Sequence, residues 1–233
     1  MTACKIQLEK VSLNFDGCTV LSDLSLRTSE KRLAVIGRNG SGKSTLARLI
    51  CGLIAPSEGD VTVDDVDVLN DRKMAVQTVG LLFQNPDHQI IFPTVLEEIS
   101  FGLHQIGQPT EAANDKARSI LNQFGCLDWS DRAIVNLSQG QRHLVCLLSI
   151  LAMSPRLLVL DEPFAGLDFP TKSYLAGLLE DLDQTILQIT HDTNSIAAYD
   201  RVIWLDHGSI QQDAPPVEVF PNFKAAMQEV YAL

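Results

Sequence analysis

The amino-acid sequence predicts an α/β fold with a parallel sheet, an antiparallel β region and a helical lobe. Short apolar runs without charged residues, such as 33–36 and 157–160, are typical of parallel strands buried on both faces. The first thirty residues alternate between apolar and polar side chains, which indicates antiparallel strands. Between residues 85 and 153 the apolar positions recur at helical spacing. Strands therefore flank a mostly helical insert within one domain, rather than forming two independent domains.

The composition is that of a single folded domain with few features of a nucleic-acid or lipid binder. The chain has 233 residues, 45% of them hydrophobic, which is enough to fill one sizeable core. Its net charge of −11 disfavours general binding to nucleic acid or anionic lipid, because both need cations. Five cysteines without a CxxC pair indicate a reducing compartment, with neither a zinc site nor a disulfide framework. We expect no secretory signal in residues 1–10 and no segment that enters a bilayer by itself.

The elements expected in the first part of the chain alternate between strand and turn. A hairpin is predicted by the alternation over residues 6–15 and the turn residues Asp16-Gly17. The buried strand 33–36 leads into a glycine-rich loop over 37–42, which is followed by a helix over 44–50. The other strand candidates share valine-rich or bare apolar runs, and they are residues 61–68, 79–83, 157–160, 186–190 and 202–205. Two kinds of sheet are therefore expected.

The loop between the strand 33–36 and the helix 44–50 has a complete phosphate-binding pattern. Residues 37–45 read GRNGSGKST, which fits G-x-x-x-x-G-K-[ST] in the required context of strand, loop and helix. Successive backbone N–H groups of such a loop surround phosphates, and the helix N-terminus adds its positive end. Lys43 is expected to bridge the β- and γ-phosphates, and the Ser44 hydroxyl to ligate Mg²⁺. The sequence therefore predicts a P-loop NTPase with a RecA-like core.

This loop supplies most of the expected nucleotide ligands. They are Gly37, Asn39, Gly40, Ser41, Gly42, Lys43, Ser44 and Thr45. The alternative is a glycine-rich turn with a solvated lysine, and the agreement of strand, loop and helix disfavours it.

Two carboxylates follow the apolar run 157–160. In an open parallel sheet, ligands bind at the carboxyl ends of the strands, where Asp161 and Glu162 stand. Asp161 is expected to hold Mg²⁺ through a water, and Glu162 to polarise the attacking water as a general base. Such a base contributes about 10²–10⁴ in rate. A strand end that caps a helix is the alternative, and the phosphate loop makes it less attractive.

A third segment, residues 138–141 with the sequence SQGQ, begins another helical run. Ser138 is a good N-cap, and the start of the helix provides a second anion site. Taken alone, the segment is best interpreted as a helix cap. Its position in the chain between the phosphate loop and the two carboxylates favours a role in binding the same anion.

Taken together, these segments resemble a known family. The chain is similar, in order and over essentially its whole length, to the nucleotide-binding subunit of ABC transporters. The segments that carry the resemblance are the phosphate loop, Gln84, LSQGQ at 137–141, Asp161-Glu162, Gly166-Leu167-Asp168 and His191. The resemblance implies a head-to-tail dimer with two ATP molecules between the subunits. Each ATP would contact the phosphate loop of one subunit and Ser138, Gln139, Gly140 and Gln141 of the other.

The resemblance also implies how the chain is divided. Residues 1–84 and 156–210 would form the nucleotide-binding core with its antiparallel β subdomain. Residues 85–155 would form the helical signature lobe, and residues 211–233 a C-terminal tail.

Further roles follow only from the resemblance. Phe15 would stack on adenine, although a core aromatic is the alternative. Gln84 would reach Mg²⁺ or the attacking water and report to a membrane partner. Asp168 would contact the opposite subunit, and His191 would hold the γ-phosphate. The expected catalytic residues are thus Glu162, His191 and Gln84, and the expected metal ligands are Ser44, Gln84 and Asp161.

Two departures from the family pattern stand out. Gln139 occupies a position that usually carries glycine, and Phe164-Ala165 precedes Gly166. The catalytic positions are intact, so we expect hydrolysis, and we leave open an effect of Gln139 on nucleotide affinity.

The stretch 84–103 narrows the resemblance to the ATPases of energy-coupling-factor importers, which take up vitamins and transition metals. It reads QNPDHQIIFPTVLEEISFGL. In that group it supplies a helix in the groove that receives the transmembrane coupling subunit, which implies docking near residues 84–89. A small substrate-binding membrane protein is also implied. The short chain is most similar to the ATPase of dedicated biotin systems, and cobalt or nickel systems are the alternative. An ordinary surface helix of the helical lobe is the other interpretation of residues 87–91.

The contrasting hypothesis is a soluble ABC ATPase. Repair and translation ATPases are disfavoured because the chain has no long coiled coil, one phosphate loop and a net charge of −11. Only the stretch after Gln84 argues against a role in iron–sulfur assembly. The intact Asp161-Glu162 disfavours a nucleotide sensor without turnover. We expect a homodimeric, peripheral ATPase at the cytoplasmic face of the cell membrane, with no nucleic-acid partner.

Overall fold

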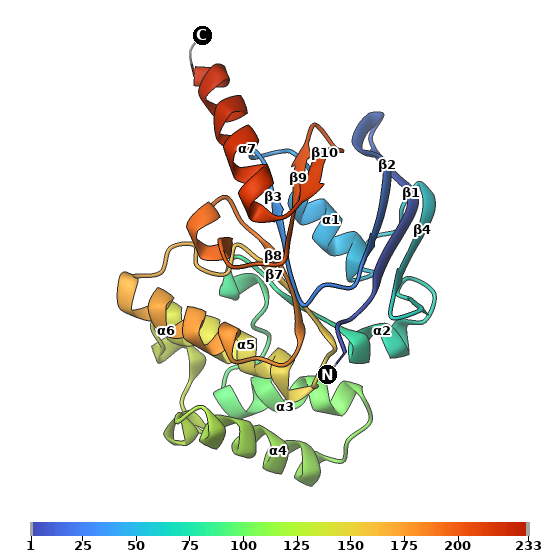
Figure 1. The fold of residues 1–233 in the computed structure, drawn as a ribbon. Helices are drawn as coiled ribbons and strands as arrows, with labels where there is room; N and C mark the ends of the chain where they lie inside the picture. The colour runs from blue at the N-terminus through green and yellow to red at the C-terminus, as the bar shows by residue number, and fades with distance from the viewer. Residues whose placement is uncertain (1, 232–233) are drawn as a thin grey trace.

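A mainly parallel sheet forms the centre of the molecule in the computed structural model, which describes residues 2–231 (Figure 1). In spatial order its strands are β10 (Ser209–Ala214), β9 (Arg201–Asp206), β3 (Arg32–Ile36), β8 (Thr185–Ile189), β7 (Leu157–Asp161) and β6 (Val79–Leu82). The five strands from β9 to β6 pair in parallel, whereas β10 is antiparallel to β9. The parallel strands expected from bare apolar runs are confirmed.

The register of this sheet brings distant segments to one edge. Val35 of β3 and Asp161 of β7 both stand opposite Ile189 of β8. The loops that follow these three strands therefore leave the sheet side by side. These loops are the phosphate loop, the segment after Asp161 and the segment that starts at Thr190.

The antiparallel region expected at the N-terminus is a second sheet, with the strand order β2-β1-β4-β5. Its strands are β1 (Ile6–Phe15), β2 (Cys18–Thr28), β4 (Glu58–Val63) and β5 (Val66–Asp67). Asp16 and Gly17 form the predicted turn, with φ values of 47° and 80°. Helix α1 (Lys43–Ile50) lies between the two sheets in Figure 1, and its buried Leu46 and Leu49 belong to the core that joins them.

The helical lobe consists mainly of α3 (Val95–Gln105), α4 (Thr110–Gln123) and α5 (Gln139–Ala152), which lie together below the sheets in Figure 1. Every residue of α5 from His143 to Ala152 is buried. These side chains share a core with residues of β7 and β8, so α5 connects the lobe to the central sheet. The predicted α/β class, with its parallel sheet, antiparallel region and helical lobe, is confirmed.

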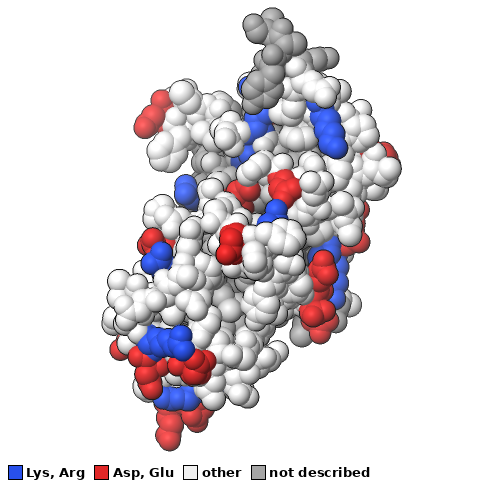
Figure 2. Space-filling view, turned by 90° about the vertical axis from the view of Figure 1, so that its left-hand side faces the viewer, with Lys and Arg blue, Asp and Glu red and all other residues white. Residues whose placement is uncertain are grey.

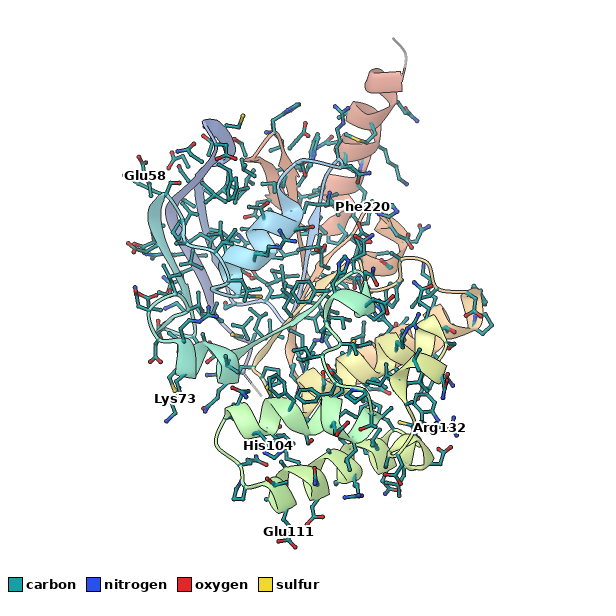
Figure 3. The ribbon with its side chains drawn as sticks, turned by 180° about the vertical axis from the view of Figure 1, so that it is seen from behind. Glu58, Lys73, His104, Glu111, Arg132 and Phe220 are labelled. Atoms are coloured by element: carbon teal, nitrogen blue, oxygen red, sulfur yellow. The ribbon has the colours of Figure 1, made fainter. Side chains whose placement is uncertain are left out.

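Several elements were not predicted by the periodicity, and the tail shows this best. Its first residues complete β10, and Pro216–Tyr231 form helix α7. Phe223 of α7 packs edge-on against Trp204 of β9, with ring centroids 5.6 Å apart. Figure 3 shows Phe220 on α7 in the upper part of the molecule and Glu111 on α4 at its lower end. The tail's last two residues, 232–233, lie outside the described part of the chain, as does Met1.

The remaining helices are α2 (Arg72–Thr78) and α6 (Phe169–Glu180). Within residues 2–231, no helix is both long enough and apolar enough to cross a membrane.

Candidate nucleotide site

The phosphate loop takes a backbone shape that requires glycine at two positions. Gly40 and Gly42 have φ values of 79° and 101°, in the left-handed region that side chains with a Cβ disfavour. A Cβ on Gly42 would also lie 2.7 Å from Cδ2 of Leu21. The loop ends at Lys43, where α1 begins, so the free N–H groups at the start of the helix face the loop.

The side chain of Lys43 bonds back to the first residues of this loop. Its Nζ donates to the carbonyl oxygens of Gly37, at 2.9 Å, and Arg38, at 2.8 Å, and only 8% of the residue is exposed. Burial lowers the pKa of Lys43, and the carboxylates of Glu162 and Asp161 oppose that shift. The acceptors of this ammonium group are neutral carbonyls, so an incoming anion can replace them with a stronger charge-assisted contact.

The side chains of Asp161 and Ser44 bring two oxygen atoms together at the end of β7. Burial raises the pKa of Asp161, and the neighbouring charge of Glu162 adds to that rise, whereas a hydrogen bond with Ser44 opposes it. A carboxylate that loses solvation in this way gains from a nearby cation. Magnesium sites commonly combine one or two protein oxygens with substrate phosphates, and this pair fits that pattern.

Glu162 is held by backbone and side-chain contacts at once. Its φ of 49° is left-handed, and its N–H donates to the carbonyl of Ile189 at 2.9 Å. Nδ1 of His191 lies 2.8 Å from Oε1 of Glu162, and the Thr190 hydroxyl donates to Oε2 at 3.3 Å. The side chain of Glu162 is 14% exposed and that of His191 71% exposed. Left-handed backbone in a residue other than glycine is a kind of strain that concentrates at functional sites.

These groups line one cleft of about 430 Å³. Most of the residues predicted for the site lie on it. The lining residues are Val20, Asn39, Gly40, Gly42, Lys43, Ser44, Thr45, Gln84, Asp161, Glu162 and His191. Val20, on β2, was not predicted, because nothing in its local sequence distinguishes it from other strand residues. The structure thus assembles one polar cleft from segments more than 150 residues apart.

Seven predicted residues lie outside the lining of that cleft, namely Phe15, Gly37, Ser41 and the four residues 138–141. Gly37 and Ser41 belong to the back of the phosphate loop, and the Ser41 hydroxyl is buried without a hydrogen-bond partner among the described residues. Phe15 stands at the tip of the first hairpin, opposite Cys18, and is 65% exposed. An exposed aromatic at this tip does not support the alternative of a core residue.

The segment 138–141 starts α5 with a complete capping box. The Ser138 hydroxyl accepts from the Gln141 N–H at 3.2 Å, and the Gln141 side chain accepts from the Ser138 N–H at 2.9 Å. The predicted N-cap is confirmed. Ser138, Gly140 and Gln141 line a separate hollow of about 300 Å³ against α6, and none of them lines the 430 Å³ cleft of the same chain.

The residues around the two departures lie close together. A Cβ on Gly166 would be 3.1 Å from Nε2 of Gln139, so the side chain of Gln139 lies over the loop before α6. Asp168 caps α6, because its Oδ1 accepts from the Thr171 N–H at 3.0 Å, and this interaction lowers the pKa of Asp168.

A second, mostly apolar groove of about 470 Å³ lies where the helical lobe meets the central sheet. Leu53, Val76 and Ile91 line it with exposed side chains. The segment after Gln84, which includes a short 3₁₀ turn at Pro86–His88, runs from the cleft to this groove.

Two side chains hold that segment in place. Gln89 accepts from the Phe83 N–H at 3.2 Å and donates to the Cys146 carbonyl of α5 at 3.3 Å. The buried Glu98 accepts from the N–H groups of Ile91 and Phe92, both at 2.9 Å.

Charge is spread thinly over the face shown in Figure 2. Basic side chains there stand singly or beside acidic ones, without forming a continuous basic stripe on that face of the described residues. Nucleic-acid binding is driven by clustered cations, so this face lacks its usual footprint.

Comparison with known proteins places the chain in a family. The model of the ABC transporter family matches residues 21–165. The Biotin transport ATP-binding protein BioM of Rhodobacter capsulatus is 51% identical over 96% of this chain and 95% of its own length. The Energy-coupling factor transporter ATP-binding protein EcfA1 of Fusobacterium nucleatum is 35% identical over 93% of this chain and 84% of its own.

Solved structures agree with these relatives. The cbiO1 protein of Clostridium perfringens, described as part of the ABC transporter complex cbiONQ, superimposes with a TM-score of 0.80 and 29% identity. That alignment covers 97% of this chain and 94% of cbiO1. The ATP-binding cassette MJ0796, solved as a dimer bound to ADP and Pi in a post-hydrolysis state, superimposes with a TM-score of 0.79 and 25% identity. That alignment covers 91% of this chain and 98% of MJ0796. The predicted P-loop NTPase fold is thereby confirmed.

Proposed function

Because the chain belongs to the ABC transporter family, we propose that it is the ATP-hydrolysing subunit of an energy-coupling-factor importer for biotin. The observation that carries the choice of solute is the 51% identity to a biotin-transport ATP-binding protein over nearly the full length of both chains. The relative named as an energy-coupling-factor ATP-binding protein supports the type of importer.

In this proposal the phosphate loop binds the triphosphate of ATP. Lys43 exchanges its two carbonyl acceptors for β- and γ-phosphate oxygens, and the N–H groups of the loop and of the start of α1 contribute further donors. Asn39 and Thr45 line the same cleft. Phe15 contributes an exposed aromatic face for the adenine ring.

Hydrolysis is assigned to Glu162, which takes a proton from the attacking water. Its carboxylate is already oriented by Thr190 and His191, so little reorganisation is needed during the reaction. An ionised carboxylate only accepts hydrogen bonds, so the contact with Glu162 requires a proton on Nδ1 of His191. Nε2 of His191 then remains for a contact with the γ-phosphate. Gln84, which lines the same cleft, is the third proposed catalytic residue beside Glu162 and His191.

A magnesium ion fits the oxygen donors of this cleft. Ser44 and Asp161 would hold it, with Gln84 as a third candidate ligand, and it would supply charge neutralisation for the triphosphate. Within the described residues, no cluster of three or more His, Cys, Asp or Glu side chains could hold a metal without other ligands. The site therefore resembles one in which substrate phosphates provide the other ligands.

We assign the active assembly to a head-to-tail homodimer. Ser138, Gly140 and Gln141 line a hollow apart from the cleft, so a second copy has to supply them to the bound nucleotide, with Gln139 beside them. The dimeric arrangement of the cassette MJ0796 supports this assembly. Asp168, exposed at the start of α6, would contact the opposite subunit.

The apolar groove is the proposed docking site for a transmembrane coupling subunit. The segment 84–89 connects the cleft with that groove, so it links the partner to the nucleotide. A small membrane protein would bind biotin. The ATPase would then be peripheral, at the cytoplasmic face of the cell membrane.

Co-purification tests the assembly. The full chain, expressed in its own cell with an affinity tag, is extracted from membranes in mild detergent and its partners are identified by mass spectrometry. We expect two small hydrophobic membrane proteins, and biotin uptake that depends on the chain. Recovery only with soluble iron–sulfur assembly proteins would refute the importer. Uptake of cobalt or nickel in place of biotin would refute the choice of solute alone.

The catalytic assignment has its own test. Glu162→Gln keeps the size of the side chain but removes the base, so we expect turnover to fall by at least 100-fold while ATP binding is retained. Turnover of the assembled complex near the wild-type rate would show that Glu162 is not the base.

A further inference from the structure

We propose that Lys172 and Asp192 are positioning residues for hydrolysis, and that they act on Glu162 through the hydroxyl of Thr190. This inference rests on the proposed function and deepens it, because it assigns a role to two charged residues that were not predicted as part of the site.

The first link is an ion pair between helix α6 and the segment that follows β8. Nζ of Lys172, on the second turn of α6, lies 2.5 Å from Oδ2 of Asp192. Their side chains are 38% and 29% exposed. The interaction with Lys172 is the main cause that lowers the pKa of Asp192, so this carboxylate stays charged near neutral pH.

The second link is the backbone next to His191. The Asp192 side chain also accepts from the Asn194 N–H at 3.0 Å. The backbone carbonyl of Asp192 accepts from the Ser195 hydroxyl at 2.8 Å. With these contacts in place, the N–H of Asp192 donates to Oγ1 of Thr190 at 3.0 Å. The ion pair therefore adds a fourth contact to the three hydrogen bonds that hold Asp192 next to His191.

The third link reaches the proposed base. A hydroxyl group that accepts one hydrogen bond still has a single proton to donate. Because the Asp192 N–H occupies a lone pair of Thr190 Oγ1, the hydroxyl proton is free to point at Oε2 of Glu162, 3.3 Å away. Lys172 thus acts, through two intermediate residues, on one of the two side-chain contacts that orient the Glu162 carboxylate, and His191 makes the other.

Phe164 gives this chain an additional support for Lys172. The ammonium nitrogen lies 5.8 Å from the centre of the Phe164 ring, in the range of a cation–π interaction. Phe164 is one of the two departures from the family pattern. Its ring and the Asp192 carboxylate hold the cation from two sides, which restricts a flexible side chain that otherwise has many rotamers.

The ion pair is also close to the proposed subunit interface, because Asp168 lies one turn before Lys172 at the start of the same helix. Any displacement of the first turn of α6 by an opposite subunit would move Lys172 and, through Asp192, the hydrogen bond to Glu162. A purely structural ion pair would not affect the chemical step in this way.

Steady-state ATP hydrolysis by the purified full chain tests the proposal with four variants. Lys172→Met and Asp192→Asn each remove the ion pair, and we expect kcat to fall about 10-fold, with the KM for ATP within 2-fold of wild type. Lys172→Arg keeps the charge and the reach, so kcat should return to within 2-fold. The double variant should lose no more than either single variant, because both act through one link.

Lys31→Met is the matched control. Lys31 pairs with Asp183 at 3.5 Å and has a similar exposure of 41%, but it lies outside the chain of contacts to Glu162. Hydrogen exchange of the nucleotide-free chain gives a second readout. We expect faster exchange over residues 190–196 in Lys172→Met, and wild-type exchange in Lys31→Met.

Each outcome has a defined meaning. A wild-type kcat in Lys172→Met, a loss that appears only in KM, or a loss that Lys172→Arg does not recover overturns the positioning role. Unchanged exchange over residues 190–196 would also overturn it, even if the isolated chain hydrolyses ATP too slowly to measure. If Glu162→Gln retains full turnover, Glu162 is not the base and the positioning role fails with that assignment. If the assembled wild-type complex hydrolyses no ATP, the proposed function itself fails, which distinguishes the two cases.

Discussion

Nδ1 of His191 lies 2.8 Å from Oε1 of Glu162, although the two residues belong to different loops of the sheet edge. The contact exists because Asp161 and Ile189, the last residues of two neighbouring strands, stand opposite each other. Glu162 then turns into the left-handed region, and its N–H returns to the Ile189 carbonyl. A pair of adjacent parallel strands is thus sufficient to place a carboxylate against an imidazole.

Replacing Asp161 by Asn should stabilise the nucleotide-free protein. Burial raises the pKa of Asp161, so its charged form is less favourable in the folded state than in the unfolded chain. The folded state binds the proton more tightly, and stability therefore falls as pH rises from the ordinary carboxyl pKa through the raised one. We expect Asp161→Asn to raise Tm by about 2–4 °C at pH 7, which corresponds to about 1 kcal/mol.

Calorimetry at several pH values checks this prediction. The gain should shrink below the ordinary pKa of an aspartate, where Asp161 is protonated in both states. An equal gain at pH 7 and in strong acid would contradict the electrostatic cause.

Gly140 should tolerate no larger residue while Thr171 is present. A Cβ at Gly140 would lie 2.5 Å from Cγ2 of Thr171, on the facing helix α6. We expect Gly140→Ala to lower the free energy of unfolding by about 1–3 kcal/mol, because Thr171 is short and has no flexible end to move. Thr171→Ser removes that methyl group, so the double variant should recover most of the loss in urea unfolding. Simple additivity of the two changes would refute steric contact as the cause.

Phe223 should anchor α7 to the central sheet. Its ring is 8% exposed and packs on Trp204, so Phe223→Ala should cost about 3–4 kcal/mol of stability and shift the Trp204 fluorescence to longer wavelength. Phe169→Ala is the matched control, because Phe169 is 82% exposed and its removal should leave the unfolding curve unchanged. Equal effects of the two substitutions would contradict the packing role.

Ile91 should distinguish docking from catalysis. It lines the apolar groove and is 68% exposed, so a charge there should exclude an apolar partner without disturbing the core. We expect Ile91→Asp to reduce recovery of membrane subunits in co-purification at least 10-fold and to leave ATP affinity unchanged. Val217→Asp is the control, because Val217 is also largely exposed, at 78%, but lies on α7, and this variant should co-purify like wild type.

The parts of this molecule that were predictable from sequence are those whose signal is local. The phosphate loop is one contiguous segment, so the spacing of its glycines and Lys43 is enough to predict the loop and the helix start that follows it. The strands before Glu162 and His191 were visible because residues buried on both faces leave bare apolar runs.

What could not be predicted depends on contacts between distant segments. Val20 is recognisable as a cleft residue only after the two sheets pack around α1. Lys172 and Asp192 are ordinary surface charges in the sequence, 20 residues apart, until α6 and the loop after β8 meet. Helix α7 was not predicted within the expected tail 211–233. Pro216 stands at its first position, where proline is tolerated, and Pro221 lies inside it.

The 138–141 segment lines a different hollow from the cleft of the same chain, and this separation predicts how inactive variants behave when they are expressed together. If every working site combines halves of two chains, two inactive variants can complement each other. Lys43→Ala damages one half, and Ser138→Arg damages the other. Random pairing of an equal mixture makes about half of the dimers mixed, and each mixed dimer contains one undamaged site out of two. Co-expression should then restore about one quarter of wild-type hydrolysis, whereas either variant alone stays inactive.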